Sequence, residues 1–276
     1  MMFEEKKIKF REKLTPIKCK INFITLNEAE VPLRNHTMML GAIYDMFTQV
    51  YRGFSRRYHS FKDVKPWSFS LLKFDQNFDL SEKSGFYKIK RGIEGYFYIK
   101  TVDPEIYKLI KRFTSKKILF QLGKLTLNIE NANIKVGNLK KIPKYINMVK
   151  IRFDTPTYFY RASMNLYESF NAETFLNFQC EKFKRLGIMH LQPEQLYPYV
   201  ESIYEDTHES WGYLTDIVQR DRVISLKGIS GDIIFEINGN RSIKELIWKI
   251  LYISEYTGIG TRSSMGFGHN SIISVK

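Results

Sequence analysis

Cysteine is scarce in this chain of 276 residues, and its scarcity excludes two kinds of architecture. Only Cys19 and Cys180 occur, and no CxxC pair is present. Two cysteines so far apart cannot build a zinc site of the usual spacing or a disulfide framework. We therefore expect no metal site and no cofactor, and a protein that works in a reducing cytoplasm.

Long apolar runs are also missing. No segment approaches the roughly 20 consecutive apolar residues that a helix needs to cross a bilayer. The first residues, 1–7, are charged and lack the apolar core of a secretory signal peptide. These absences predict a cytoplasmic protein with no membrane partner.

Acidic residues are few beside basic ones. The chain has 43 Lys and Arg against 29 Asp and Glu, which gives a net charge of +14. Such a field attracts polyanions and speeds their encounter with the protein. Hydrophobic residues make up 43 %, with 21 Phe and 17 Tyr, so a packed core is expected as well. Nucleic acid is the leading partner predicted from composition.

The first half of the chain alternates between strand and helix patterns. Apolar residues at every second position predict strands over 17–25, 67–72, 95–100 and 125–129. Helical spacing predicts a helix over 36–51, and Asp103 followed by Pro104 marks the start of another. Residues 27–35 and 56–61 are expected to be loops. The order βαββαβ is that of a ferredoxin-like unit, which we assign to residues 1–137.

A second unit follows a basic, aperiodic stretch, 138–147, which we interpret as a linker. Helices are predicted over 172–186 and 193–204, and another opens at a capping box formed by Ser242 and Glu245. Strands are predicted at 149–153, 211–217, 223–228, 231–237 and 271–275. Residues 148–276 would form a more elaborate βαββαβ half. The predicted fold class is therefore α+β, with two tandem ferredoxin-like domains and a basic cleft between them.

A glycine-rich stretch, 258–268, lies close to the end of the chain. Gly-Ile-Gly and Gly-Phe-Gly enclose a polar insert that contains Arg262, Ser263 and Ser264. Glycine permits positive φ and close approach of a ligand, and successive backbone N–H groups can bind an anion. Arg262 could add a bidentate grip on phosphate. The alternative is a tight helix-to-strand turn with Ile259 and Phe267 in the core.

Histidine is the side chain that most readily exchanges protons near neutral pH. The five histidines are His36, His59, His190, His208 and His269. His59 follows Arg56 and Arg57 in a basic segment, which makes it the best candidate for acid–base chemistry on RNA. His36, at the start of the first predicted helix, is the alternative.

Two patterns resemble one family. The paired Gly-apolar-Gly motifs near the C-terminus resemble the glycine-rich signature of the RAMP superfamily. A tyrosine on the first predicted helix, a histidine in the loop after it and a lysine further on form a second pattern. Tyr44, His59 and Lys65 in this order resemble the catalytic set of CRISPR repeat-processing endoribonucleases of the Cas6 type. The resemblance implies that His59 moves the proton, Tyr44 assists at the 2′-hydroxyl and Lys65 stabilises the phosphorane. The RNA-binding positions predicted are Gly258, Gly260, Arg262, Ser263, Ser264, Gly266, Gly268, His36, Arg56 and Arg57.

The implied reaction is cleavage of CRISPR repeat RNA by attack of the 2′-hydroxyl, without a metal ion, to give 2′,3′-cyclic phosphate and 5′-hydroxyl ends. One alternative is a non-catalytic RNA-binding subunit of a CRISPR effector complex. Another is a metabolic enzyme or interaction module whose charge is incidental. Subunits of an effector complex are possible further partners, and both a monomer and a homodimer remain open.

Overall fold

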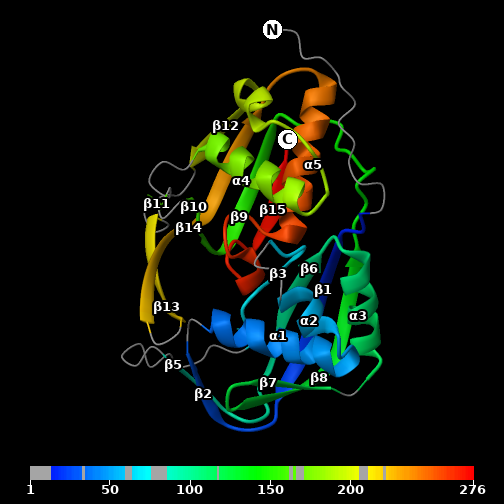
Figure 1. Cartoon of the computed structure of the whole chain (residues 1–276), viewed down its shortest axis with the longest axis vertical. Helices are drawn as coiled ribbons and strands as arrows, with labels where there is room; N and C mark the ends of the chain where they lie inside the picture. Colours follow the sequence, from blue (N-terminus) through cyan, green and yellow to red (C-terminus); the bar gives the residue numbers. More distant parts are fainter. Residues whose placement is uncertain are drawn as a thin grey trace.

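Two units of sheet and helix make up the protein, one above the other in Figure 1. The computed structural model describes residues 14–32, 35–59, 64–75, 86–116, 118–161, 164–165, 171–204, 211–219 and 222–276. The first half of the chain builds the lower unit, and the second half builds the upper unit. The predicted boundaries 1–137, 138–147 and 148–276 remain a prediction.

The first sheet has the predicted ferredoxin-like topology. Its main elements are β1 (Ile17–Thr25), α1 (His36–Val50), β3 (Trp67–Phe69), β6 (Glu94–Thr101), α3 (Pro104–Thr114) and β8 (Leu125–Val136). The strand order is β3-β6-β1-β8-β7, and every neighbouring pair is antiparallel. The additional elements are β2 (Ala29–Pro32), α2 (Phe54–His59), β4 (Lys73–Phe74), β5 (Phe86–Ile89) and β7 (Leu119–Leu122).

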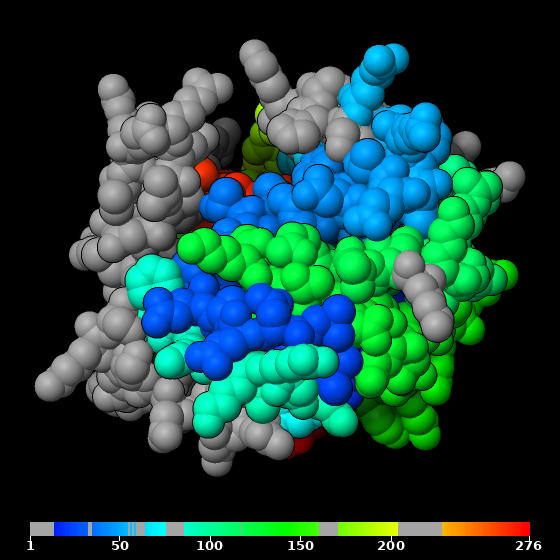
Figure 2. All heavy atoms as spheres, turned by 90° about the horizontal axis from the view of Figure 1, so that it is seen from below, coloured from blue at the N-terminus to red at the C-terminus, as the bar shows by residue number. Residues whose placement is uncertain are grey.

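Seen from below, the additions to this unit lie against one another (Figure 2). Helix α1 lies along the green β7–β8 segment, and residues of β2 lie beside the teal residues of β5, with which they pair. The core beneath is formed by one face of the sheet. Cys19, Ile21 and Phe23 of β1 are buried there with residues of α1 and α3.

The second sheet repeats this topology. Its elements are β9 (Met148–Thr157), α4 (Ala172–Arg185), β12 (Val200–Tyr204), β14 (Arg222–Ile237), α5 (Arg241–Thr257) and β15 (Asn270–Val275). The order β12-β14-β9-β15 matches that of the first sheet, and β13 (Trp211–Gln219) forms a long hairpin with β14. The short elements are β10 (Tyr160–Arg161), β11 (Met164–Asn165), η1 (Pro193–Gln195), η2 (Tyr197–Tyr199) and η3 (Ser263–Met265). The prediction of two ferredoxin-like units is confirmed.

Several predicted elements are wrong in detail. Residues 193–204 form η1, η2 and strand β12, not a helix, because Pro198, in the interior of the predicted helix, lacks the N–H group that a continuous helix needs. Residues 54–59, predicted as part of a loop, form helix α2, and 29–32 form β2. The predicted strand 67–72 is interrupted and continues as β4, whereas 223–228 and 231–237 belong to one strand, β14.

The start of α5 also differs from the prediction. Asn240, not Ser242, is the N-cap, and its side chain accepts a hydrogen bond from the backbone N–H of Ile243 at 3.0 Å. Glu245 instead accepts from Arg241 at 2.7 Å, one turn earlier on the helix. The N-cap of α3 is as predicted, because the Asp103 side chain accepts from the N–H of Glu105. The better cap for α5 lay two residues upstream of the one the pattern suggested.

A buried lysine joins the two units. Lys100 on β6 is 0 % exposed, and its Nζ donates to the backbone carbonyl of Asn270 on β15. The same Nζ lies 3.4 Å from a carboxylate oxygen of Glu255 on α5 and 3.3 Å from the hydroxyl of Ser271. Burial lowers the pKa of Lys100 to about 8. The contact fixes the end of β6 against the start of β15, beside the glycine-rich stretch.

Candidate functional site

Two of the predicted catalytic side chains meet at one backbone carbonyl. The hydroxyl of Tyr44, on α1, donates to the carbonyl oxygen of Tyr58 at 3.3 Å. The Nζ of Lys65, which precedes β3, donates to the same oxygen. Tyr58 directly precedes His59, the last residue of α2. The fold therefore gathers Tyr44 and Lys65 around the peptide that leads to His59.

Aromatic packing holds this arrangement in place. The ring of Tyr44 lies 5.4 Å from that of Phe54 and 6.2 Å from that of Trp67. Tyr44 and Lys65 are 7 % and 8 % exposed. Burial raises the pKa of Tyr44 to about 12, so its hydroxyl stays protonated at neutral pH. Tyr44 can therefore donate a hydrogen bond but is a poor base.

The remaining predicted residues of α2 are only partly described. Arg56 is exposed, whereas the side chains of Arg57 and His59 lie outside the described part of the structure. The backbone places His59 at the C-terminal end of a six-residue helix rather than in the loop that the sequence suggested. Its assignment as the acid–base group stays a prediction.

The glycines of the loop are explained by the protein itself. Gly258, Gly260, Gly266 and Gly268 all have positive φ, as the sequence predicted. A Cβ at position 268 would overlap the carbonyl oxygen of Ile259, and one at position 260 would overlap that of Tyr158. Glycine is thus required here because protein backbone, rather than a ligand, approaches these positions.

Several amides of the loop are already engaged. The N–H of Ile259 donates to the carbonyl of Gly268 at 2.9 Å, and the N–H of Thr261 donates to that of Tyr158 at 2.7 Å. The N–H of Gly268 donates to Pro156 at 2.9 Å. These three groups do not form the anion cradle that the glycine pattern suggested. This part of the loop is instead the tight helix-to-strand turn that was the alternative prediction. As that prediction requires, Ile259 and Phe267 are both 0 % exposed.

The polar insert of the loop is more accessible. Arg262 and Ser264 are half-buried, whereas Ser263 is buried. Arg262 has φ of 56°, the only positive φ of a non-glycine residue among those described. A left-handed backbone costs a residue with a Cβ of the order of 1 kcal/mol, and such strain is concentrated at functional positions. The Arg262 backbone is therefore held in this conformation at an energetic cost.

One histidine of the first half touches this loop, and it is His36. Its ring stacks on Phe267 with centroids 3.9 Å apart and planes 23° apart. Its Nδ1 lies 3.2 Å from the carbonyl oxygen of Met265, which makes Nδ1 the donor. His36 is only 4 % exposed. Its observed role is to pack the start of α1 against the loop, and contact with RNA stays a prediction.

No sequence pattern pointed to a lysine beneath the loop. Lys182 of α4 is 4 % exposed, and its Nζ donates to the carbonyls of Thr257 and Gly258 at 2.6 and 2.8 Å. It also donates to the hydroxyl of Ser263 at 2.6 Å. A cation at the C-terminus of α5 is favoured by the helix dipole. Lys182 thus ties the end of α5 to the polar insert; in the sequence it was only one charge on an amphipathic helix.

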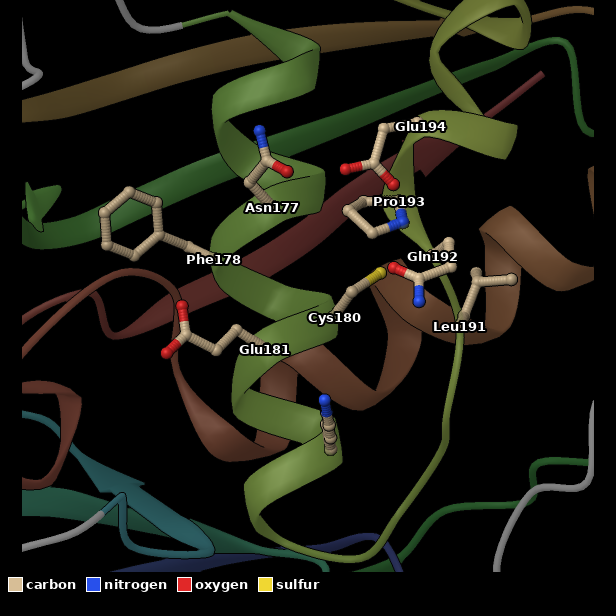
Figure 3. A pocket seen from close by; sticks show the side chains of 9 residues that line it. Asn177, Phe178, Cys180, Glu181, Leu191, Gln192, Pro193 and Glu194 are labelled. Carbon is tan, nitrogen blue, oxygen red and sulfur yellow. The ribbon is translucent and has the colours of Figure 1, made fainter.

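A pocket in the second unit is separate from these groups. Helix α4 contributes Asn177 and Cys180, and the segment before β12 contributes Gln192 and Glu194 (Figure 3). Burial raises the pKa of Cys180 to about 12, so its thiol remains protonated and unreactive. The pocket contains none of the predicted site residues, and its carboxylates do not suit a polyanion.

The described residues contain neither a cluster of metal ligands nor a helix that could span a membrane. Within those residues, no group of three or more His, Cys, Asp or Glu side chains could hold a metal ion. No helix among them is long and apolar enough to cross a membrane.

Much of the second unit matches a known family profile. Residues 151–270 match the profile described as CRISPR-associated endoribonuclease Cas6. The resemblance to the Cas6 family is confirmed. The matched segment contains the complete glycine-rich loop as well as Lys182. No curated protein matches the sequence.

Solved structures of Cas6 proteins share the fold. A Cas6 structure described as a product complex superposes with a TM-score of 0.67 at 12 % identity, covering 94 % of this chain and 100 % of that one. A Cas6-related protein from Pyrococcus furiosus gives 0.66 at 15 % identity, covering 95 % and 100 %. A structure described as a RAMP protein binding different RNA substrates gives 0.65 at 14 %, covering 94 % and 100 %. At these identities the matches concern the fold alone.

Proposed function

We propose that this chain is an endoribonuclease that cuts CRISPR repeat RNA without a metal ion. The observation that carries the proposal is the convergence of Tyr44 and Lys65 on the carbonyl of Tyr58, next to His59, in a chain with the Cas6 sequence pattern. Two residue types suited to RNA cleavage thereby lie against the peptide that precedes His59. The Cas6 structures described with a product or a substrate mimic support RNA as the substrate.

In the proposed reaction the RNA supplies its own nucleophile. The 2′-oxygen forms a bond to phosphorus while the bond from phosphorus to the 5′-oxygen breaks, which leaves a 2′,3′-cyclic phosphate and a 5′-hydroxyl. A base must take the 2′-proton, an acid must supply one to the 5′-oxygen, and positive charge must stabilise the phosphoryl oxygens. We assign proton transfer to His59 and charge stabilisation to Lys65. Tyr44, protonated at neutral pH, serves as a hydrogen-bond donor near the 2′-oxygen.

The glycine-rich loop would hold the RNA through its insert. Since the amides of Ile259, Thr261 and Gly268 are engaged, we assign phosphate binding to Arg262, with Ser264 beside it. The four glycines and Ser263 then act by shaping and holding the insert. Arg56, exposed on α2, extends the positive charge toward His59. Arg57 and His36 stay predicted RNA contacts.

The decisive experiment is incubation with repeat RNA from the same genome in EDTA, followed by analysis of the product ends. We expect a 2′,3′-cyclic phosphate and a 5′-hydroxyl. A 3′-hydroxyl product, or strict dependence on Mg²⁺, would refute the mechanism. His59→Ala is expected to slow cleavage by about 10²–10⁴-fold, the usual contribution of general acid–base catalysis. His190→Ala, which changes an exposed histidine of the second unit, is the matched control.

A non-catalytic RNA-binding subunit is the second candidate. The observation that favours it is the structural neighbour described only as a RAMP protein binding RNA substrates. Wild-type protein that binds the repeat but leaves it intact would establish this alternative. A cytoplasmic location and contact with effector-complex subunits belong to the proposal in both cases.

A further inference from the structure

One face of the first sheet turns away from α1 and α3 and carries polar and aromatic side chains. Along β1, Lys18, Lys20 and Asn22 alternate with the buried residues, so they lie on this second face. The register of β1 with β6 places Tyr98 opposite Lys20 and Tyr96 opposite Asn22. We call this surface the open face. Its other members are Asn131, Asn133 and Lys135 on β8 and Lys73 on β4.

The two tyrosines lie at the centre of the open face with lysines against them. The Nζ of Lys20 is 4.0 Å from the ring centroid of Tyr96, and that of Lys18 is 5.0 Å from the ring centroid of Tyr98. The rings meet edge to face with centroids 5.5 Å apart. Both tyrosines are half-buried and lie outside the hydrophobic clusters of the core. Core packing therefore does not explain why two aromatic rings stand on this face.

The charges around the rings are mostly positive. Acidic groups lie toward the ends of the open face: Glu94 opposite Ile24, and Glu255 with an oxygen 3.8 Å from Lys18. Asp154 lies near Tyr98 but accepts a hydrogen bond from Ser271. In the described part of the chain, Lys20 has no acidic partner. The middle of the face thus combines half-buried aromatic rings with cations, a combination that suits nucleic acid.

We propose that the open face binds a single-stranded segment of RNA, with bases stacked on Tyr96 and Tyr98 and phosphates held by Lys18 and Lys20. The inference rests on the proposed function only in taking RNA as the ligand. Every base has a π-face, so stacking on aromatic rings tolerates many sequences. A lysine that leaves its ring for a phosphate exchanges a cation–π contact for a charge-assisted hydrogen bond.

The position of Tyr98 connects this surface to the glycine-rich loop. Its ring stacks on that of His269 with centroids 6.3 Å apart and planes 17° apart, and His269 directly follows the loop. Lys100, the next residue of β6 on the same face, is covered by β15. One end of the open face therefore adjoins the segment assigned to phosphate binding, so a single strand can contact both.

The test measures binding of a fluorescein-labelled, single-stranded 12-nucleotide RNA of mixed sequence with 2′-O-methyl groups throughout. Such an RNA lacks the 2′-hydroxyl nucleophile, so binding is read whether or not the chain cleaves RNA. Replacing both tyrosines (Tyr96→Leu with Tyr98→Leu) is expected to raise Kd about tenfold or more, since stacking on each ring contributes to affinity. Phe at both positions keeps the rings and should restore binding.

Tyr145→Leu is the matched control, because Tyr145 is 62 % exposed and has Lys144 5.2 Å from its ring centroid but lies outside the open face. It should change Kd by less than twofold. Wild-type Kd for the double leucine variant would overturn the proposal, as would equal affinity for a duplex of the same sequence.

Photocrosslinking of wild-type protein to RNA containing 5-iodouridine gives a readout that no variant can confound. Adducts on the peptide that contains Tyr96 and Tyr98 support the proposal, and adducts confined to other peptides overturn it. Cleavage of repeat RNA with normal binding by the leucine variant would reject the open face alone. Loss of binding in that variant, with no cleavage by wild-type protein, would reject only the proposed reaction.

Discussion

The two units share one strand order but place their additions at different connections. In the first unit the addition follows the first helix, where α2 carries His59 into the neighbourhood of Tyr44 and Lys65. In the second it follows the last helix, where the glycine-rich loop links α5 to β15. In the proposed function, the first copy of the scaffold would carry the chemistry and the second would bind the ligand, because function resides in what is added to a fold.

The basic side chains on the first strand of each unit, β1 and β9, also have different partners. On β9, Arg152 and Lys150 pair with Asp232 at 2.7 and 3.1 Å. The Arg152 guanidinium and Lys150 lower the pKa of the Asp232 carboxyl through hydrogen bonds and charge. On β1, Lys20 faces the ring of Tyr96 instead. Two cations of β9 are thus ion-paired with one carboxylate, whereas Lys20 of β1 lies over an aromatic ring.

The largest expected effect is on catalysis, through the first unit. Lys65→Met removes the cation next to His59, and we expect the single-turnover cleavage rate to fall about 10²–10³-fold, the usual loss on removing one transition-state donor. Lys108→Met, on the exposed side of α3, is the matched control. A Lys65→Met rate within threefold of wild type would show that the first unit does not carry the chemistry in this way.

The next effect concerns stability in the second unit. Gly268→Ala forces a Cβ onto the carbonyl of Ile259 at φ of 63°, and we expect the free energy of unfolding to fall by about 3 kcal/mol. Gly41→Ala is the control in the first unit, since α1 leaves open space there and alanine should add about 0.5–1 kcal/mol. Urea titration measures both. Equal effects would remove the special role of the loop glycine.

A third effect is a dependence of stability on pH that comes from Lys182. Burial lowers the pKa of Lys182 from 10.5 to about 7 in the folded protein. Between these values the unfolded chain binds the proton more strongly, so raising the pH from 7 to 10 favours the folded state. One such group contributes up to about 1.4 kcal/mol per pH unit.

Lys182→Met should therefore flatten the rise in unfolding free energy with pH that wild type shows above pH 7. Urea titrations at pH 7, 8 and 9 test this, and Lys184→Met, an exposed neighbour on α4, is the control. Parallel pH dependences for wild type and Lys182→Met would contradict the lowered pKa of Lys182 beneath the loop.

The smallest effect is expected at Arg262. Arg262→Gly removes the guanidinium but relieves the left-handed backbone at φ of 56°. We expect affinity for repeat RNA to fall several-fold. The slope of log affinity against log salt concentration should fall by about 1, as expected for the loss of one phosphate contact. The free energy of unfolding should not fall. Unchanged affinity would move the phosphate contact away from this loop, whereas lost stability would make Arg262 a structural residue.

Much of this architecture was predictable from local pattern. The alternation in β1 and the helical spacing in α1, α3, α4 and α5 reflect burial on one face, which the sequence displays directly. The missed elements have identifiable causes: proline at 198 interrupted a segment that otherwise resembled a helix, and α2 is too short to show a period. The glycines pointed to the correct loop, but the reason for them was close packing of backbone.

The sequence by itself determined the two βαββαβ units, the excess of positive charge and the candidate set of Tyr44, His59 and Lys65. These features follow from local periodicity, composition and motif spacing. Only the tertiary structure decided that Tyr44 and Lys65 share one carbonyl, that Lys182 lies beneath the glycine-rich loop and that Tyr98 adjoins His269. Each of these contacts depends on how a side chain packs against other elements of the folded chain, and no local pattern records that geometry.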